Sequence, residues 1–460
     1  MVREFMKIPR LRAPAPRRAF RRLAGAAALL AAAVSAAPAA AVTLIRDAEI
    51  ERTLARLSEP IFRAASLPPN QVEILIVDDA APNAFVFGGR NMVFTTGLLR
   101  RFQEPAQLQG VIAHETGHLV GGHLARRSIA MRNARGPAVA ALILGVVAAA
   151  AAGNSGAGVG VAGGAQAAIQ RALLAYNRGE EASADQAALT YLERAGIDPS
   201  GMRDVLNVFR GQEVFSDRNQ DPYARSHPIS SERLALVERR SAESPYLDKA
   251  PDPELLYWTE RMGAKLEAFL IAPRTTLGRL SDGAGDEFSR LKRAVALHRL
   301  PDPPAALEEV DRLIAMRPND PYYNELKGQI LLESGRGPEA VGPYRRAVQL
   351  APDEPLILGH LGRALLSLNT PEGDREAVRA LERGAVQSGG GTPSLLRDLA
   401  FGYGRLGEDG KAALAAAERF ALLGALSDAR RMAERAKAQL PSGSPAWLRA
   451  DDIVASLPDR

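Results

Sequence analysis

The stretch that decides the fold of this chain is Val111-Ile-Ala-His-Glu-Thr-Gly-His-Leu-Val120. Positions four apart on a helix lie about 40° apart around its axis, so the imidazoles of His114 and His118 would share one face and could hold a single divalent cation. The carboxylate of Glu115 falls where it can hold a water molecule and accept its proton. The pattern therefore predicts a zinc helix; the alternative is a pair of core histidines satisfied by hydrogen bonds.

The surrounding sequence predicts that this helix is buried. Pro105 after Glu104 suits the first turn of a helix, where a missing N–H costs nothing. Apolar residues then recur at helical spacing and would seat the helix in a core: Leu108, Val111, Ile112, Leu119 and Leu124.

Strands are predicted just before the helix. Residues 71–78 favour an extended strand, and the segments 84–87 and 91–95 are separated by Gly88-Gly-Arg90, which indicates a hairpin. The edge of such a sheet, beside the helix, can bind an extended substrate as an additional strand through main-chain hydrogen bonds. A purely structural hairpin is the alternative.

The first 41 residues are predicted to be a secretory signal peptide. Four arginines between positions 17 and 22 precede an apolar run over residues 23–34, and small residues follow to Ala41. This order is typical of an export signal cleaved after Ala39 or Ala41. Arg17-Arg18 also fits a twin-arginine signal, so the export route stays open, and a retained anchor is the alternative.

Removing this segment changes the charge balance of the chain. It holds eight of the 58 basic and one of the 53 acidic side chains, which leaves a formal charge of minus two on residues 42–460. No basic excess remains to neutralise phosphates, so nucleic-acid binding is not expected. The chain has no cysteine, which excludes disulfide bonds and thiolate metal sites and is compatible with an oxidising compartment.

A second pattern occupies residues 302–460. Four pairs of residues are 34 positions apart: Pro318 and Pro352, Pro321 and Pro355, Gly328 and Gly362, Leu332 and Leu366. This period is typical of tetratricopeptide repeats, which stack helix pairs into a surface that holds protein segments; a plain helical domain is the alternative. We therefore expect four parts: signal peptide (1–41), catalytic domain (42–270), linker (271–301) and all-α repeat domain (302–460).

Residues 137–168 are rich in alanine and glycine. As a helix, the apolar part 137–152 would reach about 24 Å, short of the ~30 Å hydrocarbon core of a bilayer. We expect a helix beside the active site, continued by a flexible loop that covers the cleft or touches a membrane surface. An insertion without function is the alternative.

A catalytic zinc takes three protein ligands and leaves one position open. His123 lies about 140° around the helix from His118 and would point away, and position 124 is leucine where a metzincin-like site needs histidine. Glu181 and Asp185, four apart on the next predicted helix, are better placed. Glu181 would be the third ligand, with Glu180 as its competitor, and Asp185 would accept a hydrogen bond that orients a histidine.

Together these motifs resemble a known family. His114-Glu-Thr-Gly-His118, then Glu181-x-x-x-Asp185, then His227-Pro228 followed by Arg233 is similar to the gluzincin peptidases that include HtpX and the CAAX prenyl endopeptidases. The resemblance covers essentially all of residues 42–460. It implies an α+β, mostly α fold: a gluzincin metalloprotease domain with a small β-sheet and the motif helix, followed by a tetratricopeptide-repeat solenoid.

For members with an export signal and such repeats, the resemblance implies a periplasmic zinc endopeptidase. Its implied substrates and partners are unfolded or stalled outer-membrane β-barrel proteins and the barrel assembly machinery, with peripheral contact to the membrane left open. The resemblance also implies that His227 approaches the metal, either as a switchable fourth ligand or as a transition-state donor.

We hypothesise that zinc on His114, His118 and Glu181 activates water for attack on a peptide carbonyl. Glu115 would take the proton and pass it to the leaving amine, and His227 or Arg233 would stabilise the oxyanion. Glu115, Asp185 and His227 are thus the candidate catalytic residues. Two alternatives stay open: a repeat-based chaperone or scaffold whose metal site is normally blocked, and a general scavenging protease.

Overall fold

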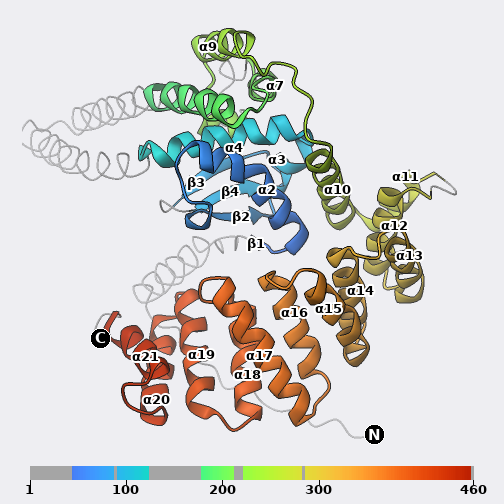
Figure 1. Cartoon of the computed structure of the whole chain (residues 1–460), viewed down its shortest axis with the longest axis vertical. Coiled ribbons are helices and arrows are strands. Elements are labelled where there is room, and N and C mark those ends of the chain that lie inside the picture. The colour runs from blue at the N-terminus through green and yellow to red at the C-terminus, as the bar shows by residue number, and fades with distance from the viewer. Residues whose placement is uncertain (1–43, 88–90, 124–177, 212–220, 282–284, 457–460) are drawn as a thin grey trace, which may run out of the picture. The chain divides into compact units, whose positions relative to one another are not determined.

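The computed structural model describes residues 44–87, 91–123, 178–211, 221–281 and 285–456 (Figure 1). The predicted signal peptide and the alanine- and glycine-rich segment 137–168 lie outside these ranges. Among the helices described, none combines the length and hydrophobicity that a membrane span needs.

A four-stranded sheet begins the catalytic part of the chain. β1 (Leu44–Ile45) pairs antiparallel with β2 (Glu73–Val77), and β2 runs parallel to β4 (Asn91–Thr95). β3 (Ala84–Phe87) pairs antiparallel with β4, which completes the order β1-β2-β4-β3. The predicted hairpin is confirmed, and β3 is an edge strand of the described sheet.

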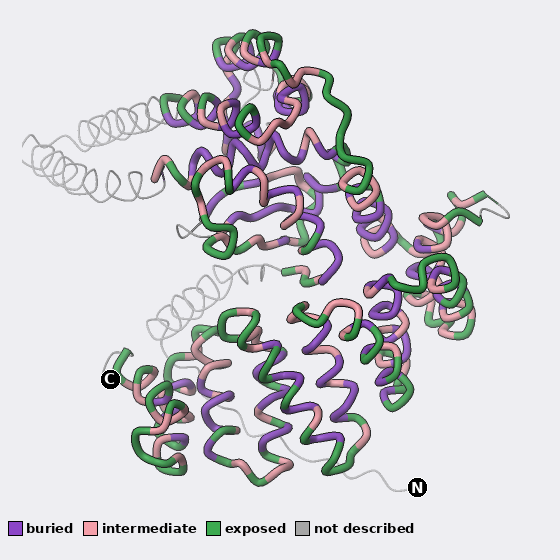
Figure 2. Tube along the Cα trace, viewed as in Figure 1, coloured by how far each residue is buried: buried purple, intermediate pink, exposed green. Residues whose placement is uncertain are grey.

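Two helices pack on each other and on the sheet, α2 (Ala48–Ala64) and α4 (Pro105–Val120). Asp47 caps α2 by accepting a hydrogen bond from the Ile50 amide, and Pro105 opens α4 as predicted. Of the predicted stripe, Leu108, Val111 and Ile112 are buried, Leu119 is half-buried, and Leu124 lies outside the described residues. The three buried residues share one cluster with residues of α2 and β4: Leu54, Leu57, Met92 and Phe94. Figure 2 shows that α4 is buried along nearly its whole length.

The remaining helices of this part supply the other walls of the site. They are α3 (Thr96–Arg101), the helical residues 178–195, α7 (Ser200–Val208), α8 (Pro222–Ser226), α9 (Ser231–Ala242) and α10 (Pro253–Leu270), with a short 3-10 turn at Pro69–Gln71. α7 crosses α4 closely, because glycines stand on both sides of the contact: a Cβ on Gly110 would lie 2.7 Å from Met202 Cα.

After α10, the described residues form helices and their connections, without strands. The helices are α11 (Pro273–Arg279), α12 (Glu287–Arg299), α13 (Pro303–Met316), α14 (Pro321–Glu333), α15 (Gly337–Leu350), α16 (Pro355–Leu366), α17 (Pro371–Gln387), α18 (Pro393–Arg405), α19 (Asp409–Leu422), α20 (Leu426–Gln439) and α21 (Pro445–Ser456). α11 and α12 lie within the predicted linker, and α12 packs against α13 through Leu291 and Val310. The expected α+β, mostly helical class is confirmed.

The 34-residue period has a structural cause. Pro321 and Pro355 each occupy the first turn of a helix, α14 and α16. Gly328 lies in α14 against the Tyr344 ring of α15, where a Cβ would come within 2.8 Å of the ring, and Gly362 lies likewise against Leu381 of α17. Each repeat thus places a glycine where its two helices cross.

Candidate metal centre

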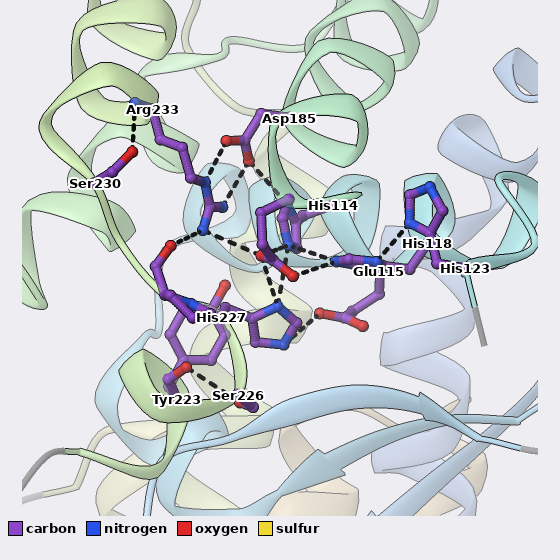
Figure 3. Close-up of polar contacts among 12 residues, drawn as sticks. His114, Glu115, His118, His123, Asp185, Tyr223, Ser226, His227, Ser230 and Arg233 are labelled. Atoms are coloured by element: carbon purple, nitrogen blue, oxygen red, sulfur yellow. Dashed lines mark hydrogen bonds and ion pairs between the residues drawn. The ribbon is translucent and has the colours of Figure 1, made fainter. Parts of the chain in front are cut away.

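Two imidazoles of α4 face one another in the interior. The Nε2 atoms of His114 and His118 lie 3.1 Å apart, and the two residues are only 2% and 4% exposed (Figure 3). One helical turn separates them, so both rings lie on the face of α4 that the motif predicts.

A carboxylate from another helix completes a triangle with these rings. Glu181, in the helical residues 178–195, places Oε2 3.2 Å from His114 Nε2 and Oε1 3.2 Å from His118 Nε2. Within the described ranges, the side chains able to hold one metal ion are His114, His118, Glu181 and His227, whose ligand atoms lie within 4.8 Å of one another. The competing candidate Glu180 is not a member of that group.

His227 is the fourth member of the group. It caps the C-terminal end of α8, and its Nδ1 lies 3.2 Å from both His114 Nε2 and Glu181 Oε2. Its Nε2 lies 3.0 Å from the Ala84 carbonyl oxygen of β3. A carbonyl only accepts, so Nε2 donates to it, and in the neutral ring the lone pair of Nδ1 then faces the cluster.

Asp185 and Arg233 contact the cluster on the side of His114 Nδ1, the ring nitrogen that points away from the other ligand atoms. Asp185 Oδ1 lies 2.9 Å from His114 Nδ1, where the predicted orienting role requires it. Arg233 in α9 donates to both Asp185 oxygens at 2.6 and 2.8 Å, to the Pro228 carbonyl at 2.8 Å, and pairs with Glu181 Oε2 at 3.1 Å. Its guanidinium thus contacts groups behind the cluster in this structure, and the oxyanion contact considered from sequence stays a prediction.

Two contacts of the site were not predicted from sequence. His123 Nδ1 lies 2.8 Å from His118 Nδ1, on the ring nitrogen turned away from the cluster. Tyr223 stacks on His227, with ring centroids 4.9 Å apart and planes at 34°. The only sequence signal for Tyr223 is its place four residues before His227, one helical turn away.

Glu115 is buried beside the cluster without a hydrogen bond. Neither of its carboxylate oxygens has a hydrogen-bond partner among the described residues, and Oε1 lies 3.3 Å from His227 Nε2. An unsatisfied buried carboxylate is costly unless a ligand or water meets it. This group therefore fits a site that takes a water molecule when the metal is bound.

The electrostatics of the cluster favour a cation. Although burial lowers the pKa of His114, hydrogen bonds to Asp185 and Glu181 raise it to about 10. Burial raises the pKa of Glu181, but the charge of His227 and hydrogen bonds from His114 hold it well below its usual range. The carboxylates thus hold positive charge at the centre, which a proton supplies when no metal does.

The spacing of the donors fits a metal ion. In a tetrahedron with bonds of about 2.0–2.1 Å, ligand atoms lie about 3.3 Å apart. The separations among His114, His118 and Glu181 are 3.1–3.2 Å. Two imidazole nitrogens and a carboxylate at this spacing can hold a catalytic divalent cation.

The family comparison agrees with this chemistry. Residues 45–241 match peptidase family M48, a range that contains the whole cluster and Glu115. The chain is therefore a metalloendopeptidase, and the matched range holds the cluster of His114, His118, Glu181 and His227 that could bind its metal ion.

Curated relatives extend the likeness beyond the catalytic domain. The chain is 25% identical over 433 residues to the beta-barrel assembly-enhancing protease of Escherichia coli O157:H7, which covers 90% of this chain and 84% of that protein. The enzyme of the same name in Yersinia pestis is 25% identical over 350 residues, 75% of this chain and 70% of that one. The chain thus resembles beta-barrel assembly-enhancing proteases over most of its length, which agrees with the peptidase resemblance found in its sequence motifs. A thermophilic TPR protein of Thermus thermophilus aligns with 37% of this chain, and with all of its own chain, at 20% identity and a TM-score of 0.26.

Proposed function

We propose that this chain is a zinc-dependent periplasmic endopeptidase that hydrolyses misfolded or stalled outer-membrane β-barrel proteins and holds them through its tetratricopeptide repeats. The buried triangle of His114, His118 and Glu181 carries the proposal, because two nitrogen donors and one oxygen donor at 3.1–3.2 Å suit zinc. The name of its relatives supports the substrate class. The export signal read from the sequence supports the compartment.

The cluster and the residues beside it divide the tasks of hydrolysis. His114, His118 and Glu181 would hold the zinc, which when bound polarises the scissile carbonyl and acidifies water. Glu115 accepts the proton of the attacking water and delivers it to the leaving amine. Asp185 keeps the proton of His114 on Nδ1, so that Nε2 stays a ligand.

The substrate would bind to the free edge of β3. Asn83 accepts a hydrogen bond from the Thr95 amide, so the next residue, Ala84, turns its carbonyl away from β4. That carbonyl accepts from His227 in this structure. An extended peptide added to the edge would compete for the same oxygen, and its arrival would release His227 from the cluster.

Replacing Glu115 by glutamine tests the proposal. The amide keeps the shape but accepts no proton, so casein cleavage should fall by about 10²–10⁴-fold while zinc content stays the same. Glu180→Gln is the matched control, because Glu180 is also buried but lies outside the cluster, and should cleave at the wild-type rate. Undiminished turnover of the Glu115 variant would reject the assignment.

The burial of the cluster favours a second candidate, a chaperone or scaffold whose peptidase site is blocked at rest. His227 lies among the ligand atoms and is 4% exposed. This function predicts that the Glu115→Gln protein still supports barrel assembly in cells that lack the wild-type chain. Loss of assembly together with loss of proteolysis would reject it. A third function, a general scavenging protease, would be favoured if barrel precursors did not co-purify with the repeat domain.

A further inference from the structure

Gly117 stands where α4 and the helical residues 178–195 cross. A Cβ on Gly117 would lie 2.8 Å from the carbonyl oxygen of Ala184 and 2.9 Å from its Cα. Both are backbone atoms, so they cannot rotate out of the way as a side chain can. Ordinary contacts of a Cβ begin near 3.4 Å, so any side chain at position 117 would push the two helices apart by several tenths of an ångström.

Ala184 is part of the turn that completes the metal site. Glu181 lies three residues before it and belongs to the metal cluster. Asp185 lies directly after it and contacts His114 Nδ1 on the side away from the cluster (Figure 3). Metal–ligand bonds in proteins keep their usual lengths to within about 0.2 Å. A shift of the helix at Ala184 exceeds this limit for Glu181 and moves Asp185 with it.

We infer that Gly117 is a positioning residue for the metal site: its missing side chain lets the helix of residues 178–195 approach α4 until Glu181 reaches the two histidines. The inference rests on the proposed zinc chemistry and adds the cause of the third ligand's placement. Gly117 is within a regular helix, so the glycine serves the close approach and not a left-handed backbone conformation.

Gly110 offers a matched control on the same helix. It lies two turns before Gly117, and its Cβ would approach the Met202 Cα of α7 to 2.7 Å, a conflict of the same size. α7 carries no side chain of the metal cluster. Gly110→Ala therefore reports the cost of separating two packed helices without moving a metal ligand.

The test compares Gly117→Ala and Gly110→Ala in the full chain. Zinc affinity is measured by competition with a chromophoric chelator, and metal-free stability by thermal unfolding. We expect both variants to lose similar stability, with zinc affinity reduced at least tenfold in Gly117→Ala and less than threefold in Gly110→Ala. Equal losses of affinity, or wild-type affinity in Gly117→Ala, would overturn the inference.

If the metal-free Gly117→Ala variant folds poorly, zinc-dependent refolding replaces the affinity measurement. The zinc concentration for half-maximal refolding should rise at least tenfold for Gly117→Ala relative to Gly110→Ala. A Gly117→Ala chain that stays unfolded at every zinc concentration, while Gly110→Ala refolds, would overturn the inference, since it would show a general packing role. Wild-type protein that binds no zinc would instead reject the proposed function, so the two failures are distinguishable.

Discussion

Replacing Arg233 by methionine tests how the metal cluster is held together. The guanidinium is buried and pairs with Asp185 and Glu181, whose side chains are fully inaccessible to solvent. Methionine keeps an apolar stem but removes the guanidinium from two buried carboxylates, which keep only histidine side chains as cationic partners. Breaking a buried ion pair by removing one partner costs about 3–5 kcal/mol. We expect the free energy of unfolding of the metal-free protein to fall by that amount.

Zinc should recover part of this loss. A cation in the cluster returns positive charge to Glu181, so the penalty of the Arg233→Met variant should shrink when zinc is present. Urea unfolding with and without zinc measures both values. Fluorescence of Trp258 in α10 reports on the catalytic domain if Trp447, the second tryptophan, is replaced by phenylalanine in all variants.

An exposed ion pair supplies the control. Arg210 and Glu238 lie 3.1 Å apart, but their side chains are 58% and 44% exposed. Solvent screens such a pair, so Arg210→Met should change the free energy of unfolding by less than about 1 kcal/mol. In the metal-free protein, an Arg233→Met loss no larger than that of Arg210→Met would refute the reasoning.

Three further changes give distinct outcomes. Asp185→Asn should weaken zinc affinity about 10–100-fold in chelator competition, because the neutral amide orients His114 less strongly; unchanged affinity would speak against the orienting role. His227→Ala should raise the cleavage rate of an unstructured peptide several-fold, since it removes a group from the cluster; a large fall would instead indicate a transition-state donor. Burial and the charge of Glu325 raise the pKa of Glu354 from 4.5 to about 7, so the folded state loses stability as pH rises through this window. Glu354→Gln should therefore stabilise the chain by about 1–3 kcal/mol at pH 8 and have little effect at pH 4 in thermal unfolding; equal effects at both pH values would contradict this.

The sequence predicted those parts of the fold that depend on residues close together in the chain. The motif helix, the hairpin split at Gly88-Gly-Arg90 and the 34-residue glycine period are each set within one element or one repeat. The spacing of Glu181 and Asp185 likewise identified two residues that the structure brings to His114. Their roles in catalysis stay predictions until the variants above are measured.

Contacts between distant segments were beyond the reach of these patterns. The sequence shows that Arg233 follows the His227-Pro228 pair. Whether its side chain faces the substrate or Asp185 depends on how α9 packs. The hydrogen bond from His227 to Ala84 joins residues 143 positions apart. The sequence predicted only a linker over 271–301, where the structure has α12. Leu291, Ala294 and Val295 recur there at helical spacing, but this apolar stripe is narrow and lies among charged residues.

The central claim is that this chain cleaves peptide bonds with one zinc ion held by His114, His118 and Glu181. Its most direct test is elemental analysis of purified residues 42–460, run beside a casein-cleavage assay of the same sample with and without chelator. We predict close to one zinc per chain and cleavage that chelator abolishes and zinc restores. Protein without zinc, or cleavage that resists the chelator, would contradict the account.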